Sequence, residues 1–174
     1  MAVPELRTPP FRTQGSGEVS SLRSSKGLLP AQSNQLLMIE GSSTMDASVL
    51  WKLSYGMYVI GVNDSGRMTG CIVNTVFQVT SENPTLAVSL NKNNYTYEVL
   101  KRDGKLAISI ISEKTDPNVI SKLGFASGRD KNKFEGLKYK TVDGLPVVEE
   151  NSCGQVICEV VGNYDVGTHC VFLV

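Results

Sequence analysis

Short apolar runs separated by turns dominate the chain beyond residue 44. The runs are rich in β-branched residues, which favour extended backbone, and most of them are too short for a helix. The turns at 63–66 and 81–84 consist mainly of Asn, Asp, Ser, Gly and Pro, which favour reversal of the chain. We therefore predict strands at 57–62, 67–74, 75–80, 85–91, 105–111, 138–142, 154–161 and 168–174.

A smaller part of the chain carries helix signals. Gly104 follows the segment 94–103, and glycine just past the last turn is a common helix stop. Asp116 can cap the next helix, and Pro117 suits its first turn. We predict helices at 94–103 and 116–125, and a short one from Thr44 or Asp46 to Leu53. Many short strands with two or three short helices predict a mainly β fold, a barrel or a sandwich with accessory helices.

Residues 1–44 differ from the rest of the chain. They contain four of the seven prolines and one aromatic residue, Phe11, and no strand or helix period persists along them. Such a composition buries too little apolar surface to offset the entropy of ordering. We predict a disordered leader before a single domain at 45–174. Two alternatives are a targeting peptide, which the acidic residues of the segment disfavour, and a natural start at Met45.

Charge and cysteine content argue against several classes of function. Lys plus Arg and Asp plus Glu both number 17, without the basic excess typical of nucleic-acid-binding domains. No apolar run approaches the roughly 20 residues of a membrane span, and the first residues lack the pattern of a secretory signal. The four cysteines form no CxxC pair, which argues against a zinc ribbon or a rubredoxin site. Free cysteines in strands favour a reducing compartment, so we predict a cytoplasmic protein without nucleic-acid or membrane partners.

Polar residues interrupt two of the predicted strands. Asn74, Thr75, Gln78 and Thr80 lie within this stretch, and alternation places Asn74, Gln78 and Thr80 on one face. The simplest interpretation is that this face meets solvent. The alternative is a ligand laid against the sheet and bound by amide and hydroxyl groups.

The loop 91–96 shifts the balance toward a ligand. It lies between a predicted strand and a predicted helix, where unpaired amide groups and the helix dipole attract an anion. The loop supplies the short polar residues Asn93, Asn94 and Thr96 and the cation Lys92. Taken alone, the loop is more simply interpreted as the N-cap of the following helix with one exposed lysine. Together with residues 74–80, however, it fits a mononucleotide whose flat ring would lie near the backbone of residues 70–72.

Four segments carry a resemblance to a known family. They are VNTVFQVTSENP at 73–84, AVSLNKNNYT at 87–96, GFASGRDKNKF at 124–134 and GTHCVFLV at 167–174. In this order and spacing they resemble the flavin reductase-like, FMN-binding split-barrel proteins, and within them the flavoredoxin and ferric-reductase branch. The resemblance covers about residues 45–174. It implies a Greek-key six-stranded antiparallel barrel, a homodimer, and FMN in a groove near the subunit interface.

The resemblance also implies roles for residues of this chain. The strand 70–75 would line the flavin ring and ribityl chain, with Cys71 and Ile72 offering backbone groups. His169, in the Gly-x-His element, would lie near the flavin and the nicotinamide donor and is the candidate catalytic residue. The candidate cofactor-binding residues are Cys71, Ile72, Asn74, Thr75, Asn91, Lys92, Asn94, Tyr95, Thr96 and Arg129.

The activity that the resemblance implies is that of an FMN-dependent oxidoreductase. It would pass electrons from NADH or NADPH through bound FMN to a flavin, a ferric complex or a small redox protein. The alternatives are a non-enzymatic FMN electron carrier and a truncated barrel without activity. Relatives usually continue past the last strand, whereas this sequence stops at Val174, so we expect a domain shortened at its C-terminal end. The chain shows no Ser-His-Asp, paired-carboxylate or metal-ligating constellation, as expected if the cofactor supplies the chemistry.

Overall fold

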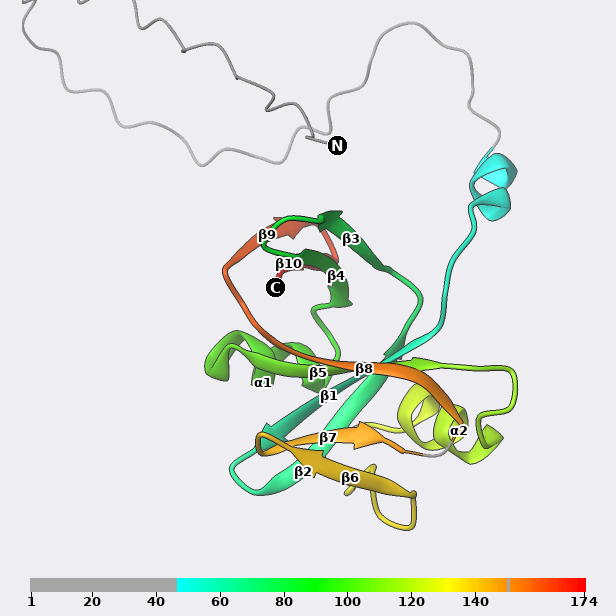
Figure 1. The fold of residues 1–174 in the computed structure, drawn as a ribbon, viewed down its shortest axis with the longest axis vertical. Helices are drawn as coiled ribbons and strands as arrows, with labels where there is room; N and C mark the ends of the chain where they lie inside the picture. Colours follow the sequence, from blue (N-terminus) through cyan, green and yellow to red (C-terminus); the bar gives the residue numbers. More distant parts are fainter. Residues whose placement is uncertain (1–46, 150) are drawn as a thin grey trace, which may run out of the picture. The chain divides into compact units, whose positions relative to one another are not determined.

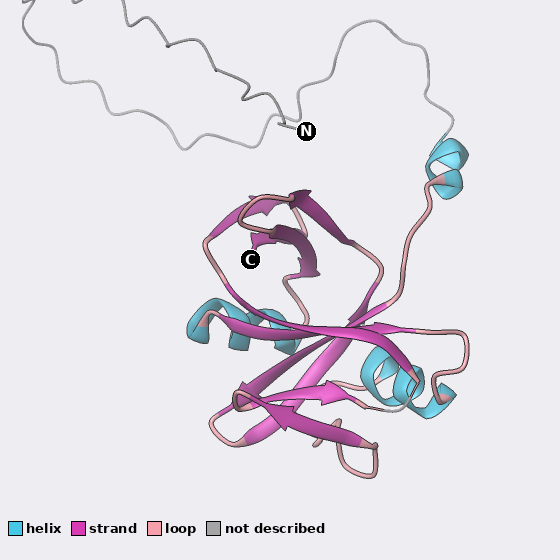
Figure 2. Ribbon diagram, in the orientation of Figure 1, coloured by secondary structure: helices cyan, strands magenta, loops and turns pink. Residues whose placement is uncertain are grey.

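The computed structural model describes residues 47–149 and 151–174, within a compact unit that spans Asp46–Val174. The predicted leader at 1–44 lies outside the described residues. Figures 1 and 2 show a strand-rich fold with short helices, and the described residues contain two α-helices and one 3-10 helix. The elements in chain order are η1 (Ala47–Lys52), β1 (Tyr58–Asp64), β2 (Arg67–Val73), β3 (Val76–Thr80), β4 (Thr85–Asn91), α1 (Tyr95–Asp103), β5 (Lys105–Ile111), α2 (Pro117–Phe125), β6 (Tyr139–Val142), β7 (Leu145–Val148), β8 (Ser152–Glu159), β9 (Gly162–Val166) and β10 (His169–Leu173).

The strands form two antiparallel sheets and a separate hairpin. The first sheet has the order β2-β1-β5-β8, and the second has the order β3-β4-β10-β9. The β6–β7 hairpin packs against β1 and β5, so the first sheet lies between this hairpin and the second sheet (Figure 1). The chain passes from the first sheet to the second between Val73 and Val76, which puts Asn74 and Thr75 at the junction.

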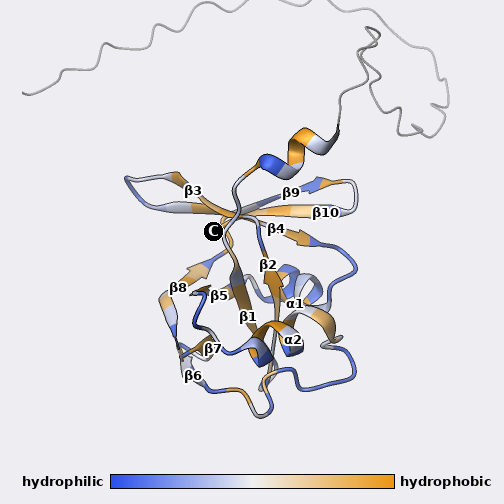
Figure 3. Ribbon diagram, turned by 90° about the vertical axis from the view of Figure 1, so that its right-hand side faces the viewer, coloured by the Kyte–Doolittle hydropathy of each residue, from blue (hydrophilic) through white to orange (hydrophobic). Residues whose placement is uncertain are grey.

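Both faces of the first sheet are covered by apolar side chains. Ile60 and Cys71 pack on one face with Leu90 of β4 and Phe172 of β10. Val59 on the opposite face packs with residues of α2, the loop after it and β7, namely Val119, Leu123, Phe134 and Val148. Figure 3 shows the apolar colouring concentrated along β1 and β2. Burial on both faces explains why residues 57–62 form a continuous apolar run rather than an alternating pattern.

The two α-helices form where their caps predict. The Asn94 side chain accepts a hydrogen bond from the amide of Thr96 at the start of α1, and Gly104 ends the helix with φ at 70°. Asp116 caps α2 through the amide of Asn118, with Pro117 in the first turn. None of the helices in the described residues is long and apolar enough to cross a membrane.

The mainly β class is confirmed, and the errors lie late in the chain. The prediction of one strand near 138–142 missed β7, because Pro146 interrupts its apolar pattern. The predicted strand at 154–161 corresponds to β8, and the following strand β9 was missed because its sequence, GNYDV, is mostly polar. The short N-terminal helix is a 3-10 helix at Ala47–Lys52.

Candidate functional site

A groove opens where the two sheets meet. It has a volume of about 470 Å³, which lies in the usual range for small-molecule sites. The end of β2, the 74–75 junction, β4, the cap of α1, β9 and β10 all contribute to its wall. The lining residues are Ile72, Val73, Asn74, Thr75, Ser89, Leu90, Asn91, Asn94, Val166, His169 and Val171.

The pairing of β4 with β10 builds one wall of the groove. His169 lies opposite Asn91, and Val171 lies opposite Ser89. Because side chains two residues apart share a face of a strand, both pairs present the same face. The sequence alone gave no reason to predict Ser89 or Val171 as groove residues. The one available signal was that Ser89 lies two residues before Asn91, and therefore on the same face of the strand.

Asn91 and Asn94 keep hydrogen-bond donors for a ligand. Asn91 Oδ1 accepts from the Asn93 amide at 2.9 Å, and Asn94 Oδ1 accepts from the Thr96 amide at 3.2 Å. With each oxygen bonded to the chain, each Nδ2 group is left with a hydrogen to donate, although the Asn94 side chain also interacts with the buried Cys71 thiol. The helix dipole adds partial positive charge at this end of α1. The groove therefore has an end suited to an anion, although no lysine or arginine lines it.

Asn74 and Thr75 form a second polar position. The Thr75 hydroxyl donates to Asn74 Oδ1 at 3.0 Å, and the Thr75 carbonyl accepts from the Ser89 amide at 3.2 Å. The junction is thereby attached to β4 while the Asn74 side chain remains exposed. The interpretation of these residues as ligand contacts is compatible with their position at the groove.

Lys92 and His169 differ in their access to the groove. The Lys92 ammonium lies 3.3 Å from the carboxylate of Asp165 and lowers the pKa of that carboxyl group, and Lys92 does not line the groove. His169 is exposed at the groove, and its Nδ1 lies 2.9 Å from the hydroxyl of Thr168. Lys92 can thus serve a ligand only from the rim, whereas His169 faces it directly.

Tyr95 and Arg129 lie away from the groove. They belong to a set of five charged residues and one tyrosine that we name the hairpin cluster: Asp64, Arg67, Tyr95, Glu98, Arg102 and Arg129. The Tyr95 hydroxyl donates to Asp64 at 2.6 Å, and the Arg67 and Arg102 guanidinium groups donate to the same carboxylate. These bonds, led by the one from Tyr95, lower the Asp64 pKa to about 2. Arg129 pairs with Glu98, and its guanidinium carbon lies 5.4 Å from the centre of the Tyr95 ring. The geometry does not bring either predicted cofactor-binding side chain to the groove.

Cys71 and Thr96 are buried beneath the groove, each 1% exposed. Burial raises the pKa of the Cys71 thiol to about 11, so the thiol is neutral. Neither side chain lines the groove, and the Thr96 hydroxyl lies beside the Cys71 thiol, where it lowers the thiol pKa against the effect of burial. Cys71 can therefore offer a ligand only backbone groups, and its contact with a flavin ring stays a prediction. β2 is an edge strand that pairs with β1 alone in its sheet. The backbone groups on its other edge therefore have no strand partner in that sheet.

Gly70, the first of the residues 70–72 predicted to lie near a flat ring, has its space filled by the chain itself. A Cβ atom at this residue would lie 2.4 Å from the Ile60 carbonyl oxygen and 3.2 Å from the ring of Phe134. The glycine thus permits close packing of β1 and the 126–138 loop on β2, rather than the approach of a ligand.

Comparisons with known proteins agree with this geometry. The flavin reductase like domain model matches residues 50–174. The ferric-chelate reductase (NAD(P)H) of Archaeoglobus fulgidus is 38% identical over 130 residues, which are 74% of this chain and 77% of the relative. The high molecular weight rubredoxin of Moorella thermoacetica is 37% identical over 130 residues, which are 74% of this chain and 57% of the longer relative.

Solved structures show the same fold at lower identity. The NADH:FAD oxidoreductase SgcE6 of Streptomyces globisporus superposes with a TM-score of 0.66 at 17% identity, over 72% of this chain and 74% of that one. The flavoredoxin of Methanosarcina acetivorans superposes with a TM-score of 0.61 at 19% identity, over 68% of this chain and 64% of that one. The two unclosed sheets are compatible with a split barrel, and the oxidoreductase class predicted from the sequence is confirmed. The chain belongs to the flavin reductase-like domain family.

Proposed function

We propose that the chain binds FMN in the groove and works as an NAD(P)H-dependent reductase. The observation that carries this proposal is the convergence of Asn74, the neighbouring residues Asn91 and Asn94, and His169, from three segments of the chain, around one groove with an apolar part. The apolar part of the lining is formed by Ile72, Val73, Leu90, Val166 and Val171. A flat ring system suits such a wall, and a phosphate suits the polar end beside α1.

The protein's own contribution is to hold and orient the cofactor. When bound, FMN accepts the hydride and passes electrons onward. The side-chain amides of Asn91 and Asn94 and the N-terminus of α1 hold the phosphate end. Asn74 and Thr75, which line the groove, would bond the ribityl chain, and the backbone of Cys71 and Ile72 would face the ring. The apolar wall keeps water from one side of the ring.

His169 is the residue we assign to the reacting end. It is exposed, it lines the groove, and the Thr168 hydroxyl fixes one of its ring nitrogens. In this position it orients the nicotinamide donor or the electron acceptor. Lys92, at the rim, adds long-range attraction for phosphate and reaches a ligand only by leaving Asp165.

The names of the relatives, rather than the shape of the groove, suggest the electron acceptor. One relative is named a ferric-chelate reductase and another a rubredoxin, so the proposed acceptors are a ferric complex or a small redox protein. An FMN carrier that takes electrons from a partner protein remains the second candidate, because the same groove serves both. The four free thiols of the chain agree with a reducing, cytoplasmic location.

We also propose that two copies associate. Large apolar side chains are exposed on the 47–57 segment, on β3 and on β9, with Trp51 86%, Phe77 56% and Tyr164 64% exposed. Large exposed apolar patches on a protein surface often mark sites of protein–protein interaction. Sedimentation velocity should give a dimer, and a monomer at micromolar concentration would refute this part of the proposal.

The direct test is a titration of the purified full chain with FMN. We expect bound FMN by absorbance and mass, and rapid bleaching at the flavin band on mixing with NADH or NADPH. FMN binding without bleaching by either nucleotide would support the carrier. A chain that takes up no FMN would overturn both candidates.

A further inference from the structure

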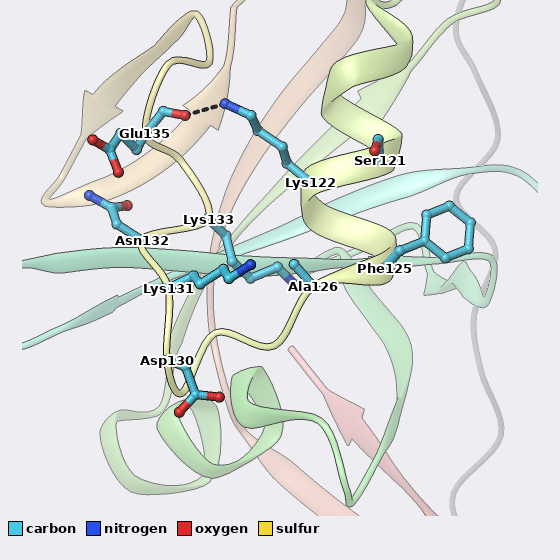
Figure 4. Close-up of a pocket in the computed structure, with 9 residues that line it drawn as sticks. All are labelled: Ser121, Lys122, Phe125, Ala126, Asp130, Lys131, Asn132, Lys133 and Glu135. Carbon is cyan, nitrogen blue, oxygen red and sulfur yellow. Dashed lines mark hydrogen bonds between the residues drawn. The ribbon is translucent and has the colours of Figure 1, made fainter.

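Lys133 is a buried lysine without an acidic partner. It lies in the loop after α2 and is 4% exposed, and its Nζ donates to the Leu123 carbonyl oxygen at 2.7 Å. Figure 4 shows it between the end of α2 and the neighbouring loop. In the part of the chain that the structure describes, no carboxylate lies within ion-pair distance of this ammonium group. Burial lowers the pKa of Lys133, because removing the ammonium group from water disfavours its charged form.

Helix capping explains only part of this arrangement. The carbonyl groups at the end of α2 carry partial negative charge, which a cation stabilises. Lysines near helix ends usually do this from the surface, as their long side chains allow. Full burial therefore calls for a further reason.

A close backbone approach presses the loop onto β2. A Cβ atom at Gly128 would lie 2.4 Å from the Thr69 hydroxyl and 3.4 Å from Cδ of Lys133, so only glycine fits there. The loop thereby holds the Lys133 side chain between α2 and the edge strand. Its charge also acts on the Cys71 thiol, where it opposes the effect of burial.

A short chain of contacts links the ammonium to the groove. Leu123, which accepts its hydrogen bond, is followed by Gly124, and a Cβ atom there would lie 3.6 Å from Cγ1 of Ile72. Ile72 lines the groove. The positive charge therefore lies behind the strand segment against which the proposed flavin ring packs.

We propose that Lys133 is a charge-tuning residue that raises the reduction potential of the bound flavin. The inference rests on the proposed function. A hydride brings two electrons and one proton from the nicotinamide, which becomes a cation, and the flavin ring gains one negative charge. A nearby buried cation stabilises that added charge more than it affects the neutral oxidised ring, since Coulomb interactions are strong in a low dielectric.

The cavity beside Lys133 gives less support to an anion-binding site. It has a volume of about 660 Å³ and Lys133 itself lines it, but Asp130 and Glu135 line it together with Lys122 and Lys131. The Lys122 ammonium already donates to the Glu135 carbonyl oxygen at 2.5 Å, as Figure 4 shows. Mixed charges of this kind do not favour a free anion. Lys133 does not line the groove, so its charge would act on the groove across β2.

The test compares Lys133→Gln with Lys131→Gln in the full chain. Glutamine removes the charge but can still donate to Leu123, and Lys131 is an exposed lysine of the same cavity. For each variant, the dissociation constant of oxidised FMN is measured on the flavin-free protein, and the midpoint potential on the complex. For Lys133→Gln we expect little change in oxidised FMN affinity and about tenfold weaker affinity for reduced FMN, which lowers a two-electron potential by about 30 mV.

Lys133→Arg, which keeps the charge, should restore the potential, and Lys131→Gln should leave it unchanged. A wild-type potential in Lys133→Gln, or an equal fall in Lys133→Arg, would assign Lys133 to packing alone. Lys133→Met serves as a second neutral variant if Lys133→Gln fails to fold. If the wild-type chain binds no FMN, the proposed function fails first, and this inference fails with it.

Discussion

Asn94 and Tyr95 are consecutive residues that serve two regions of opposite character. Asn94 lines the groove, where Asn91 and Asn94 keep free amide donors and no lysine or arginine is present. Tyr95 belongs to the hairpin cluster, where Asp64 receives hydrogen bonds from Tyr95, Arg67 and Arg102. The comparison shows that density of charge does not identify the ligand site. The charged region has satisfied its bonds within the chain, whereas the neutral groove has not.

The largest effect should come from adding negative charge to the groove. Asn91→Asp with Asn94→Asp keeps the oxygen atoms that accept from the backbone, and Asp is as good an N-cap as Asn. The two carboxylates replace donors and repel phosphate, so FMN affinity should fall about 100-fold, with little change in stability. Fluorescence titration with FMN measures it.

The matched control is Asn83→Asp with Asn118→Asp, which adds the same charge at exposed positions outside the groove. Its FMN affinity should stay near that of the wild type. An equal loss in both double variants would mean that net charge, rather than the groove, governs binding.

A substitution in the hairpin cluster should lower stability while leaving FMN affinity nearly unchanged. Asp64→Asn removes charge-assisted hydrogen bonds to a carboxylate that is 14% exposed, which should lower the free energy of unfolding by about 2 kcal/mol. FMN affinity should change less than threefold. Urea denaturation with a parallel FMN titration tests both statements, and a large loss of affinity at normal stability would place the cluster in the binding site.

The same residue should produce a pH dependence of stability. Its pKa in the folded chain is about 2, below its ordinary value of 3.8. The stabilisation is therefore complete above the ordinary value and is lost as pH falls through the folded value. Between pH 5 and pH 2 the wild-type chain should lose about 2 kcal/mol more than Asp64→Asn. Parallel curves for the two proteins would contradict the assignment.

A smaller effect is expected at the reacting end of the groove. His169→Ala removes an exposed side chain whose described polar contact is with Thr168. The protein should still bind FMN, while stopped-flow reduction by NADH or NADPH slows by about tenfold. An unaltered rate would make His169 a structural or solvent-facing residue.

The smallest effects should appear at the rim, with opposite signs. Lys92→Ala removes attraction for phosphate and should weaken FMN binding about threefold, whereas Asp165→Asn frees Lys92 and should strengthen it by a similar factor. Both changes should diminish at 0.5 M salt. Changes of the same sign in the two variants would exclude Lys92 from ligand binding.

The comparison also shows where sequence reasoning succeeds. The caps Asn94 and Asp116 and the stop Gly104 act between neighbours in the chain, so α1 and α2 were predictable. The polar residues Asn74 and Asn91 were identifiable because they interrupt apolar strands. The missed strands β7 and β9 have weak local patterns and are held in place by pairing with β6 and β10.

By itself, the sequence determined the mainly β class, the family and the polar segments that line the groove, because local propensity and motif spacing lie within short stretches of chain. Only the tertiary structure decided that Tyr95 and Arg129 point away from the groove, that Ser89 and Val171 line it, and that Lys133 is buried against the end of α2. Those outcomes depend on partners as distant as Asp64 for Tyr95 and on the register of β4 with β10. Such contacts are set by packing between segments, for which a single sequence carries no local signal.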